Sequence, residues 1–379
     1  MRTSKLPDVG TTIFSVMSAL AAKHNAVNLG QGFPSFPIDE AWGMLMKKYI
    51  ETGKNQYAPM PGIPELRKVL AQKYSLFGSY DPEGEITITA GATQAIFTAI
   101  QAFVHPGDEV ILFAPAYDCY APAVTLAGGK VKWLYLSHPE YSIPWEKLEE
   151  AITEKTAMIV INHPHNPTGT SLNEGDMKRL AQMISGTDIV LLSDEVYEHI
   201  LFDGKSHDSA LKYPEIRNNV LSVFSFGKTF HMTGWKMGYA IADASLMNEF
   251  RKVHQFNVFS CNTPVQYALN EYLENPKNYL ELSSFYQNKR DGFLKQIEHP
   301  KLKFLPCTGT YFVLADFSDM SDEKDTDIAI RWTKEHRLTT IPCSVFYPDG
   351  RDHKVVRMCF AKDDETMQQA AQIINNLPF

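Results

Sequence analysis

The segment MIVINHPHNPTGTSLNEGDMKRLAQMISGTDIVLLSDEVY, residues 158–197, indicates the fold of the chain. It opens with an apolar run at 158–162, passes through a helical pattern at 172–184 and reaches a second apolar run at 189–193. Both runs are short and almost continuously apolar, as expected of strands in a sheet that is covered on both faces. The order strand, helix, strand predicts two parallel strands joined by a helical crossover.

The same alternation extends through the middle of the chain. Further strand-like runs lie at 86–89, 110–113, 131–136, 220–225 and 239–242, with helical patterns at 93–104, 120–127 and 145–152. We therefore predict an α/β fold with a three-layer, mostly parallel central sheet of about seven strands. Ligands bind such sheets at the carboxyl ends of the strands, so the residues that follow the strands are the candidates for a functional site.

The pattern changes after residue 263. Helical patterns at 263–273 and 278–297 precede strand-like runs at 311–316, 338–341 and 355–360 and a closing helix at 364–377. This mixture predicts a second, smaller α+β domain. We expect an N-terminal segment (1–35) packed on the small domain, a large ligand-binding domain (36–265) and a small C-terminal domain (266–379).

Composition excludes several classes of protein. The 379 residues are 44% hydrophobic and 21% charged, which is ordinary for a globular protein. A net charge of −8 without a basic block argues against nucleic-acid binding. The 5 cysteines include no Cys-x-x-Cys pair, which favours free thiols in a reducing compartment over disulfides or a zinc site.

No membrane protein or exported protein is expected. No apolar stretch approaches the roughly 20 residues of a membrane span. The apolar run at 13–22 is interrupted by Ser15 and Ser18, so it predicts a short helix rather than a signal peptide. We expect a cytoplasmic protein.

Polar or small residues follow several of the predicted strands. Residues 91–93 (Gly-Ala-Thr) open a helix whose free amides suit a phosphate, although a small turn capped by Thr93 would look the same. Residues 163–169 (His-Pro-His-Asn-Pro-Thr-Gly) form a rigid loop that presents an amide, and no carboxylate or cysteine nearby completes a metal site. Asp194 in Asp-Glu-Val-Tyr can serve a ligand or cap a helix.

Lys228 follows the strand at 220–225, within Gly-Lys-Thr. A P-loop needs a glycine five residues before the Gly-Lys pair, and Ser222 stands there instead. The segment Gly-Gln-Gly-Phe-Pro-Ser at 30–35 lacks the third glycine of a dinucleotide fingerprint. A buried lysine can lose its proton and attack a carbonyl, and Lys236 could hold an anion and lower the pKa of Lys228.

The order of these motifs resembles that of the class I and II aminotransferases, pyridoxal phosphate enzymes of fold type I. The likeness runs from Asn-Leu-Gly-Gln-Gly-Phe-Pro at 28–34 to Val-Val-Arg-Met-Cys-Phe at 355–360. Within the family, residues 163–169 and 227–236 are most similar to the kynurenine, glutamine-phenylpyruvate and methionine aminotransferase branch, and above all to the methionine aminotransferases.

The resemblance implies a role for individual residues. Lys228 would form a Schiff base with pyridoxal 5′-phosphate and move the proton of the substrate. Asp194 would pair with the pyridine nitrogen, and Tyr197 would bind the 3-hydroxyl oxygen of the ring. The further implied cofactor contacts are Ala92, Thr93, Tyr117, Asn166, Ser225, Lys236 and, from the other subunit of a homodimer, Tyr57.

Arg357 would bind the substrate carboxylate, helped by Gly32 and Asn166. Two residues depart from the pattern of the family. Lys236 stands where parts of the family have an arginine, so the charge is kept but not the fork. Tyr117 stands where this branch often has a phenylalanine for ring stacking.

The expected reaction is transamination by ping-pong kinetics, with a carbon–sulfur β-lyase using the same cofactor as the alternative. Dicarboxylate-specific relatives carry an arginine near residues 256–261, and this chain has Phe-Asn-Val-Phe-Ser-Cys there. A pocket lined by Phe14, Phe33, Phe256 or Phe259 would leave an aspartate side chain buried without a partner. We expect methionine as the first amino donor, with phenylalanine, tyrosine, kynurenine and glutamine as further donors, and a 2-oxo acid as acceptor.

Overall fold

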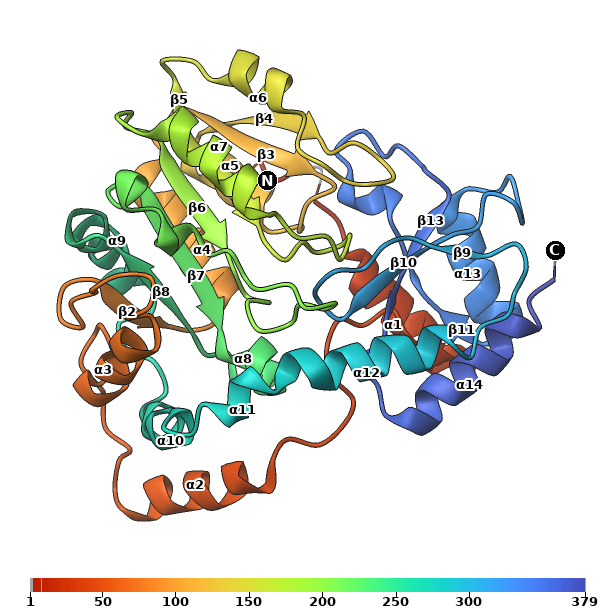
Figure 1. Ribbon diagram of the computed structural model, residues 1–379, viewed down its shortest axis with the longest axis horizontal. Coiled ribbons are helices and arrows are strands. Elements are labelled where there is room, and N and C mark those ends of the chain that lie inside the picture. Colours follow the sequence, from red (N-terminus) through yellow and green to blue (C-terminus); the bar gives the residue numbers. More distant parts are fainter. Residues whose placement is uncertain (1–2, 8, 379) are drawn as a thin grey trace.

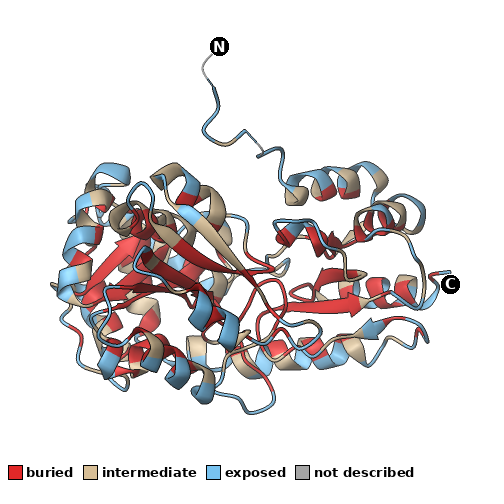
Figure 2. Ribbon diagram, turned by 90° about the horizontal axis from the view of Figure 1, so that it is seen from above, coloured by how far each residue is buried: buried red, intermediate tan, exposed pale blue. Residues whose placement is uncertain are grey.

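The protein, described by a computed structural model over residues 3–7 and 9–378, has a larger and a smaller lobe (Figures 1 and 2). The larger lobe is built on a seven-stranded sheet and the smaller lobe on a four-stranded sheet. None of the helices in these residues is long and apolar enough to cross a membrane.

The seven-stranded sheet consists of the strands that the sequence predicts, each within two residues of the expected ends. They are β2 Ile86–Thr89, β3 Glu109–Ala114, β4 Lys130–Tyr135, β5 Thr156–Asn162, β6 Val190–Asp194, β7 Val220–Ser225 and β8 Gly238–Ala242. Their order is β2-β8-β7-β6-β5-β3-β4. Only β8 runs antiparallel to its neighbours β2 and β7, so the predicted mostly parallel α/β sheet is confirmed.

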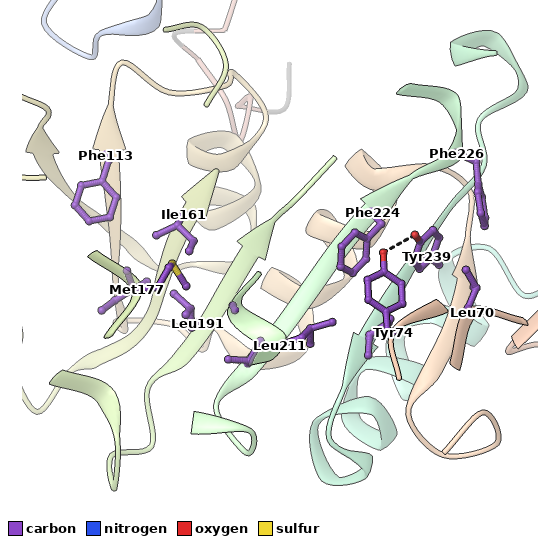
Figure 3. Packing of buried hydrophobic residues seen from close by; sticks show 14 of the residues in the cluster. Leu70, Tyr74, Phe113, Ile161, Met177, Leu191, Leu211, Phe224, Phe226 and Tyr239 are labelled. Carbon is purple, nitrogen blue, oxygen red and sulfur yellow. Dashed lines mark hydrogen bonds between the residues drawn. The ribbon is translucent and has the colours of Figure 1, made fainter. Parts of the chain in front are cut away.

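Helices cover both faces of this sheet because alternate residues of each strand point to opposite sides. One face, with Val110 and Leu112, packs against α4 Ala92–Phe103, α5 Tyr120–Ala127 and α9 Ala244–Asn257. The other face, with Ile111 and Ile161, packs against α3 Pro64–Lys73, α6 Trp145–Ala151, α7 Glu174–Ile184 and α10 Thr263–Leu273. This second core is seen in Figure 3, where the hydroxyls of Tyr74 and Tyr239 lie 2.7 Å apart.

The smaller lobe is antiparallel. Its sheet has the order β12-β13-β10-β9, made of β9 Lys303–Phe304, β10 Phe312–Asp316, β12 Ile341–Pro342 and β13 Val355–Cys359. Its helices are α12 Leu282–Leu294, α13 Asp325–His336 and α14 Asp364–Asn375 (Figure 1).

The N-terminal part of the chain packs on the smaller lobe. Helix α1 Ile13–His24 lies against α13, and β1 Val27–Asn28 pairs in parallel with β11 Leu338–Thr339. A helix was expected at 13–22, and α1 confirms it. The exact division of the chain into domains stays a prediction, since α10 packs against α3 and α2 Glu40–Glu51 of the larger lobe.

The predictions of two elements of the smaller lobe, at 338–341 and 278–297, are wrong. The run at 338–341 is not one strand, because β11 bonds to β1 while β12 bonds to β13 in a different sheet. The helix expected at 278–297 is two helices, α11 Lys277–Leu280 and α12, which meet at Glu281. Tyr279 in α11 packs on His199 of the larger lobe, whereas the buried residues of α12 belong to the core of the smaller lobe.

Candidate active site

A cavity of about 140 Å³ opens at the carboxyl ends of β5, β6 and β7, where the sequence places its candidate residues. The N-terminus of α4 and the loop after α8 Phe226–Thr229 close its other sides. The predicted residues that line it are Ala92, Thr93, Tyr117, Asn166, Asp194, Tyr197, Ser225, Lys228 and Lys236. They come together because strands that run in parallel end at the same edge of the sheet.

Lys228 lies in α8, directly after β7. The Ser225 hydroxyl caps this short helix and accepts the backbone N–H of Lys228 at 3.3 Å. The Lys228 side chain points into the cavity, and its Nζ donates to the carbonyl of Gly32 at 3.4 Å. Burial lowers the pKa of this amine to about 8, and the positive charges of Arg357 and Lys236 act in the same direction.

Asp194 ends β6 and is 4% exposed. The Tyr120 hydroxyl donates to its Oδ2 at 2.5 Å, and the Val196 N–H donates to its Oδ1 at 3.4 Å. Burial raises the pKa of Asp194 to about 6, while these hydrogen bonds and the charge of Lys228 oppose the rise. Tyr120 was not predicted from the sequence, and only its place at the start of a helix beside Tyr117 could have pointed to it.

The geometry of the α4 end of the cavity suits an anion. The cap residue of α4, Gly91, has φ +81°, and no side chain caps this 12-residue helix, which leaves its first N–H groups open. A Cβ on Gly91 would lie 3.6 Å from Nζ of Lys236. A Cβ on Gly238 would lie 2.6 Å from the Phe224 carbonyl and 3.0 Å from the Ala92 nitrogen, so the backbones approach closely here.

Asn162 and Asn166 connect Asp194 to Arg357. The Asn162 amide donates to the backbone carbonyl of Asp194 at 2.9 Å, and its Oδ1 accepts the N–H of Asn166 at 2.7 Å. The Asn166 Oδ1 in turn accepts Nη1 of Arg357 at 2.6 Å. Asn162 was not predicted, although it is the last residue of a predicted strand, directly before the His-Pro-His-Asn-Pro loop.

Arg357 lies in β13 of the smaller lobe and is 1% exposed. Its Nη2 donates to the Gly30 carbonyl at 3.1 Å, and its buried Nε has no hydrogen-bond partner among the described residues. Phenylalanine rings surround the guanidinium, whose Cζ lies 4.0 Å from the Phe312 ring, 5.2 Å from Phe14 and 5.4 Å from Phe346. A guanidinium with an unused donor suits a carboxylate, and the apolar surround strengthens that attraction.

Two tyrosines face the middle of the cavity. The Tyr117 hydroxyl lies 3.4 Å from Oγ1 of Thr93, and the Tyr197 ring makes an edge contact with Tyr311 at 5.2 Å. Burial raises the pKa of both tyrosines above its usual value, so both hydroxyls stay protonated and can donate hydrogen bonds.

Five predicted aromatic residues do not line this cavity: Phe14, which lies beside Arg357, and four others. Tyr57 is 82% exposed and Phe259 is 51% exposed, and their rings contact each other at 5.4 Å. Phe33 is 42% exposed and lies under Nζ of Lys362 at 5.0 Å. Phe256 is also exposed. The roles of these aromatics stay predictions, which a second subunit could fulfil.

The described residues fit pyridoxal 5′-phosphate. The open helix end beside Ser225 and Lys236 suits its phosphate, and the buried carboxylate of Asp194 suits a protonated ring nitrogen. The Lys228 amine, with its lowered pKa, suits condensation with an aldehyde.

Comparison with known proteins agrees with this geometry. Residues 24–374 match the family model for aminotransferase class I and II. The chain is 46% identical to the methionine aminotransferase of Escherichia coli over 99% of this chain and 98% of that protein. It is 37% identical to a kynurenine–oxoglutarate transaminase of Dictyostelium discoideum, over 95% of this chain and 93% of that protein.

A solved structure gives the same result. The E. coli protein YbdL, reported with a methionine aminotransferase function, superposes with a TM-score of 0.97 at 46% identity and covers 100% of both chains.

Proposed function

The chain belongs to the class I and II aminotransferases, and from this premise we propose that its preferred amino donor is methionine. The membership makes the protein an amino-acid aminotransferase that depends on pyridoxal 5′-phosphate. The alternative of a carbon–sulfur β-lyase is not favoured, because the E. coli and Dictyostelium relatives are aminotransferases.

We assign the cofactor contacts by the chemistry of each side chain. Pyridoxal phosphate, when bound, supplies an aldehyde that takes up the amino group and a ring that accepts electrons from the substrate. The N-terminus of α4 with Thr93, Ser225 and Lys236 would hold its phosphate. Asp194 would hold a proton on the ring nitrogen, and Tyr197 and Asn166 would bind the ring oxygen.

Lys228 would move the proton of the substrate. A pKa of about 8 leaves a useful share of this amine neutral near physiological pH, which is the form that accepts a proton. Arg357 would orient the substrate by its carboxylate, since its Nε is buried and unpartnered among residues 3–7 and 9–378. The small lobe thus positions the substrate against a base carried by the large lobe.

The phenylalanines around Arg357 carry the proposal of an apolar donor. A substrate held by its carboxylate at Arg357 would place its side chain among Phe14, Phe312 and Phe346. A thioether makes favourable contacts with aromatic rings, and its flexible chain fills irregular apolar space. An aspartate side chain there would need a second cation, and residues 256–261 supply none. The likeness to the E. coli methionine aminotransferase supports the same choice.

We also propose a homodimer in which the partner's Tyr57 reaches the phosphate. The exposure of Tyr57 and Phe259 in a single chain supports this homodimer.

We further propose the domain division 1–35, 36–265 and 266–379. All five cysteines are free, which supports a reducing compartment such as the cytoplasm.

A donor screen tests the proposed substrate. The holoenzyme is assayed with methionine, phenylalanine, tyrosine, kynurenine, glutamine and aspartate against several 2-oxo acids. We expect kcat/KM for methionine to exceed that for aspartate by at least about tenfold, equivalent to ~1.4 kcal/mol of transition-state discrimination. A preference for aspartate would contradict the apolar pocket. Pyruvate and ammonia formed from an S-substituted cysteine without a 2-oxo acid acceptor would instead support the lyase.

A further inference from the structure

Lys362 is a buried lysine without a carboxylate partner. It follows β13 at the edge of the smaller lobe and is 4% exposed. Among the described residues no aspartate or glutamate forms an ion pair with it. Lysines are rarely buried unless they are paired, because an ammonium loses its hydration on burial. Its position therefore calls for a reason other than stability.

The acceptors of Lys362 are backbone carbonyls of the loop at 30–33. Its Nζ donates to the carbonyl of Phe33 at 2.9 Å and to that of Gln31 at 3.3 Å. The two other carbonyls of the loop face the active site, since Gly30 accepts Arg357 and Gly32 accepts Lys228. Every carbonyl from residue 30 to 33 thus accepts a cationic side chain.

This loop lies directly against Arg357. A Cβ on Gly32 would lie 2.8 Å from the Phe312 ring and 3.7 Å from Nη2 of Arg357, so the bare backbone of Gly32 forms one wall of the guanidinium site. The Gly32 carbonyl also accepts the Tyr311 hydroxyl at 3.0 Å. A rotation of these peptides would therefore change the geometry of the site beside Arg357, where the substrate carboxylate is proposed to bind.

Lys362 sets the direction of the Gly32 N–H. The C=O and N–H of a trans peptide point in opposite directions. Because the Gln31 carbonyl points at Lys362, the N–H of Gly32 in the same peptide points away from Lys362. In the described part of the chain this N–H has no hydrogen-bond acceptor, and the Cα of Gly32 lies next to Nη2 of Arg357.

The loop stays attached to the smaller lobe without the Lys362 ammonium. The Ser35 N–H donates to the Ala361 carbonyl at 3.1 Å. The Ser35 hydroxyl donates to Asp363 at 3.0 Å and accepts the Asp363 N–H at 3.1 Å. Removing the ammonium would therefore free the peptides at 31–33 while the attachment at Ser35 remains.

We propose that Lys362 is a positioning residue for the substrate carboxylate. It holds the carbonyls of Gln31 and Phe33, and thereby aims the Gly32 N–H as a further donor to the carboxylate that Arg357 binds. This inference rests on the proposed function, because the carboxylate is that of an amino-acid substrate. Lys362 does not line the cavity and would act through the backbone.

The test compares Lys362→Met, which removes the donors, with Lys362→Arg, which keeps them. Lys354→Met is the control, because Lys354 also donates to two backbone carbonyls, those of Asp322 and Glu323, at 2.9 and 2.7 Å. Lys354 differs from Lys362 in that it also pairs with Asp352 at 3.2 Å. Each holoenzyme is assayed for kcat and KM with methionine at a saturating 2-oxo acid. The dissociation constant of 3-phenylpropionate, an unreactive carboxylate, is measured by calorimetry, together with the absorption spectrum and cofactor content.

We expect Lys362→Met to raise both KM and the dissociation constant of 3-phenylpropionate about tenfold, with kcat within about twofold and an unchanged cofactor spectrum. Lys362→Arg should recover most of both values, and Lys354→Met should match the wild type. Wild-type carboxylate binding in Lys362→Met, with only a lower melting temperature, would overturn the proposal.

A second variant, Lys362→Gln, covers the case in which Lys362→Met does not fold, and the wild-type assay separates the Lys362 proposal from the proposed donor preference. If Lys362→Met does not fold, Lys362→Gln against Lys362→Arg makes the same comparison, because glutamine lacks the charge and reach of the ammonium. A failure of the proposed donor preference would be seen in the wild type, and the variants would then be assayed with its best donor. A failure of the Lys362 proposal is seen only between the variants.

Discussion

At the scale of single residues, burial adjusts two ionisable groups in opposite senses. Burial moves the pKa of Lys228 down to about 8 and that of Asp194 up to about 6. Both shifts favour the neutral form, because a charged group loses hydration in the cavity. Tyr120 counteracts this for Asp194 by donating a hydrogen bond to its carboxylate. Asp194 thus remains mostly ionised at pH 7, while Lys228 is close to the pH at which it loses its proton.

Replacing Lys228 tests its assignment as the proton carrier. Lys228→Ala should still bind pyridoxal phosphate, because the phosphate and ring contacts remain, but kcat should fall by several orders of magnitude. Lys252→Ala, on the solvent side of α9, serves as the control and should behave as wild type. Single-turnover absorbance measurements check both, and wild-type turnover of Lys228→Ala would end the assignment.

The lowered pKa of Lys228 predicts the pH dependence of cofactor uptake. Only the neutral amine attacks an aldehyde, so the rate at which cofactor-free protein reacts with pyridoxal phosphate should rise with pH and level off above a midpoint near 8. Stopped-flow absorbance measures the rate. A midpoint near the ordinary lysine value of 10.5 would show that burial does not lower the pKa of this amine.

The lowered pKa of Lys228 also makes the free energy of unfolding depend on pH. Between pH 8 and 10.5 the unfolded chain holds a proton on this lysine that the folded protein has lost. The contribution of Lys228 to the free energy of unfolding of the cofactor-free protein therefore rises with pH in that window.

At the scale of elements, the anion site depends on how closely β7, β8 and α4 approach one another. Gly238 begins β8, and its Cα faces the Phe224 carbonyl in β7 and the N-terminus of α4. Only a residue without a side chain lets the helix end come this near to the sheet. The open N–H groups of α4 are thereby directed at the cavity next to Ser225.

Gly238→Ala should disturb this approach. Its Cβ would lie 2.6 Å from a carbonyl oxygen, so the helix end or the strand must shift. We expect at least about tenfold weaker binding of pyridoxal phosphate and a lower melting temperature. Gly234→Ala is the control, because a Cβ there would meet nothing within 4 Å. Equilibrium dialysis that shows unchanged affinity in Gly238→Ala would contradict the role of Gly238 in the anion site.

At the scale of the whole molecule, the site needs both lobes. Lys228 comes from the larger lobe, and Arg357 comes from the smaller one. The two lobes contact each other directly. The Ala116 N–H of the larger lobe donates to the Phe346 carbonyl of the smaller lobe at 2.9 Å, and Cζ of Arg351 lies 3.6 Å from the Tyr135 ring centroid. A small rotation between the lobes would change the distance from the substrate carboxylate to the proton carrier.

The proposed homodimer would complete the phosphate site with Tyr57 of the other subunit. We expect sedimentation velocity to give twice the mass of the chain, and Tyr57→Phe to keep the dimer but weaken cofactor binding about tenfold through the lost hydroxyl. Tyr57 is exposed in a single chain, so the same substitution should leave the fold unchanged. A fully active monomer would remove this role of Tyr57.

Much of this protein could be read from its sequence because the signals are local. The seven strands of the larger lobe are apolar runs, and the candidate residues directly follow them, as at Asp194 and Lys228. The convergence of those residues follows from parallel topology alone. The resemblance to a family added the roles, which local patterns do not encode.

What only the tertiary structure decided are contacts between segments far apart in the chain. Asn166 and Arg357 are 191 residues apart, and Lys362 and Gln31 are 331 apart, yet both pairs are hydrogen-bonded. The run at 338–341 divides between two sheets because its partners are β1 and β13. The hydrophobic periodicity of the sequence indicates that a residue is buried, but it does not indicate which distant residue packs against it. The sequence by itself therefore determined the strands and the residues at their ends, whereas contacts between distant segments decided the surroundings of Arg357 and the partners of the loop at 30–33.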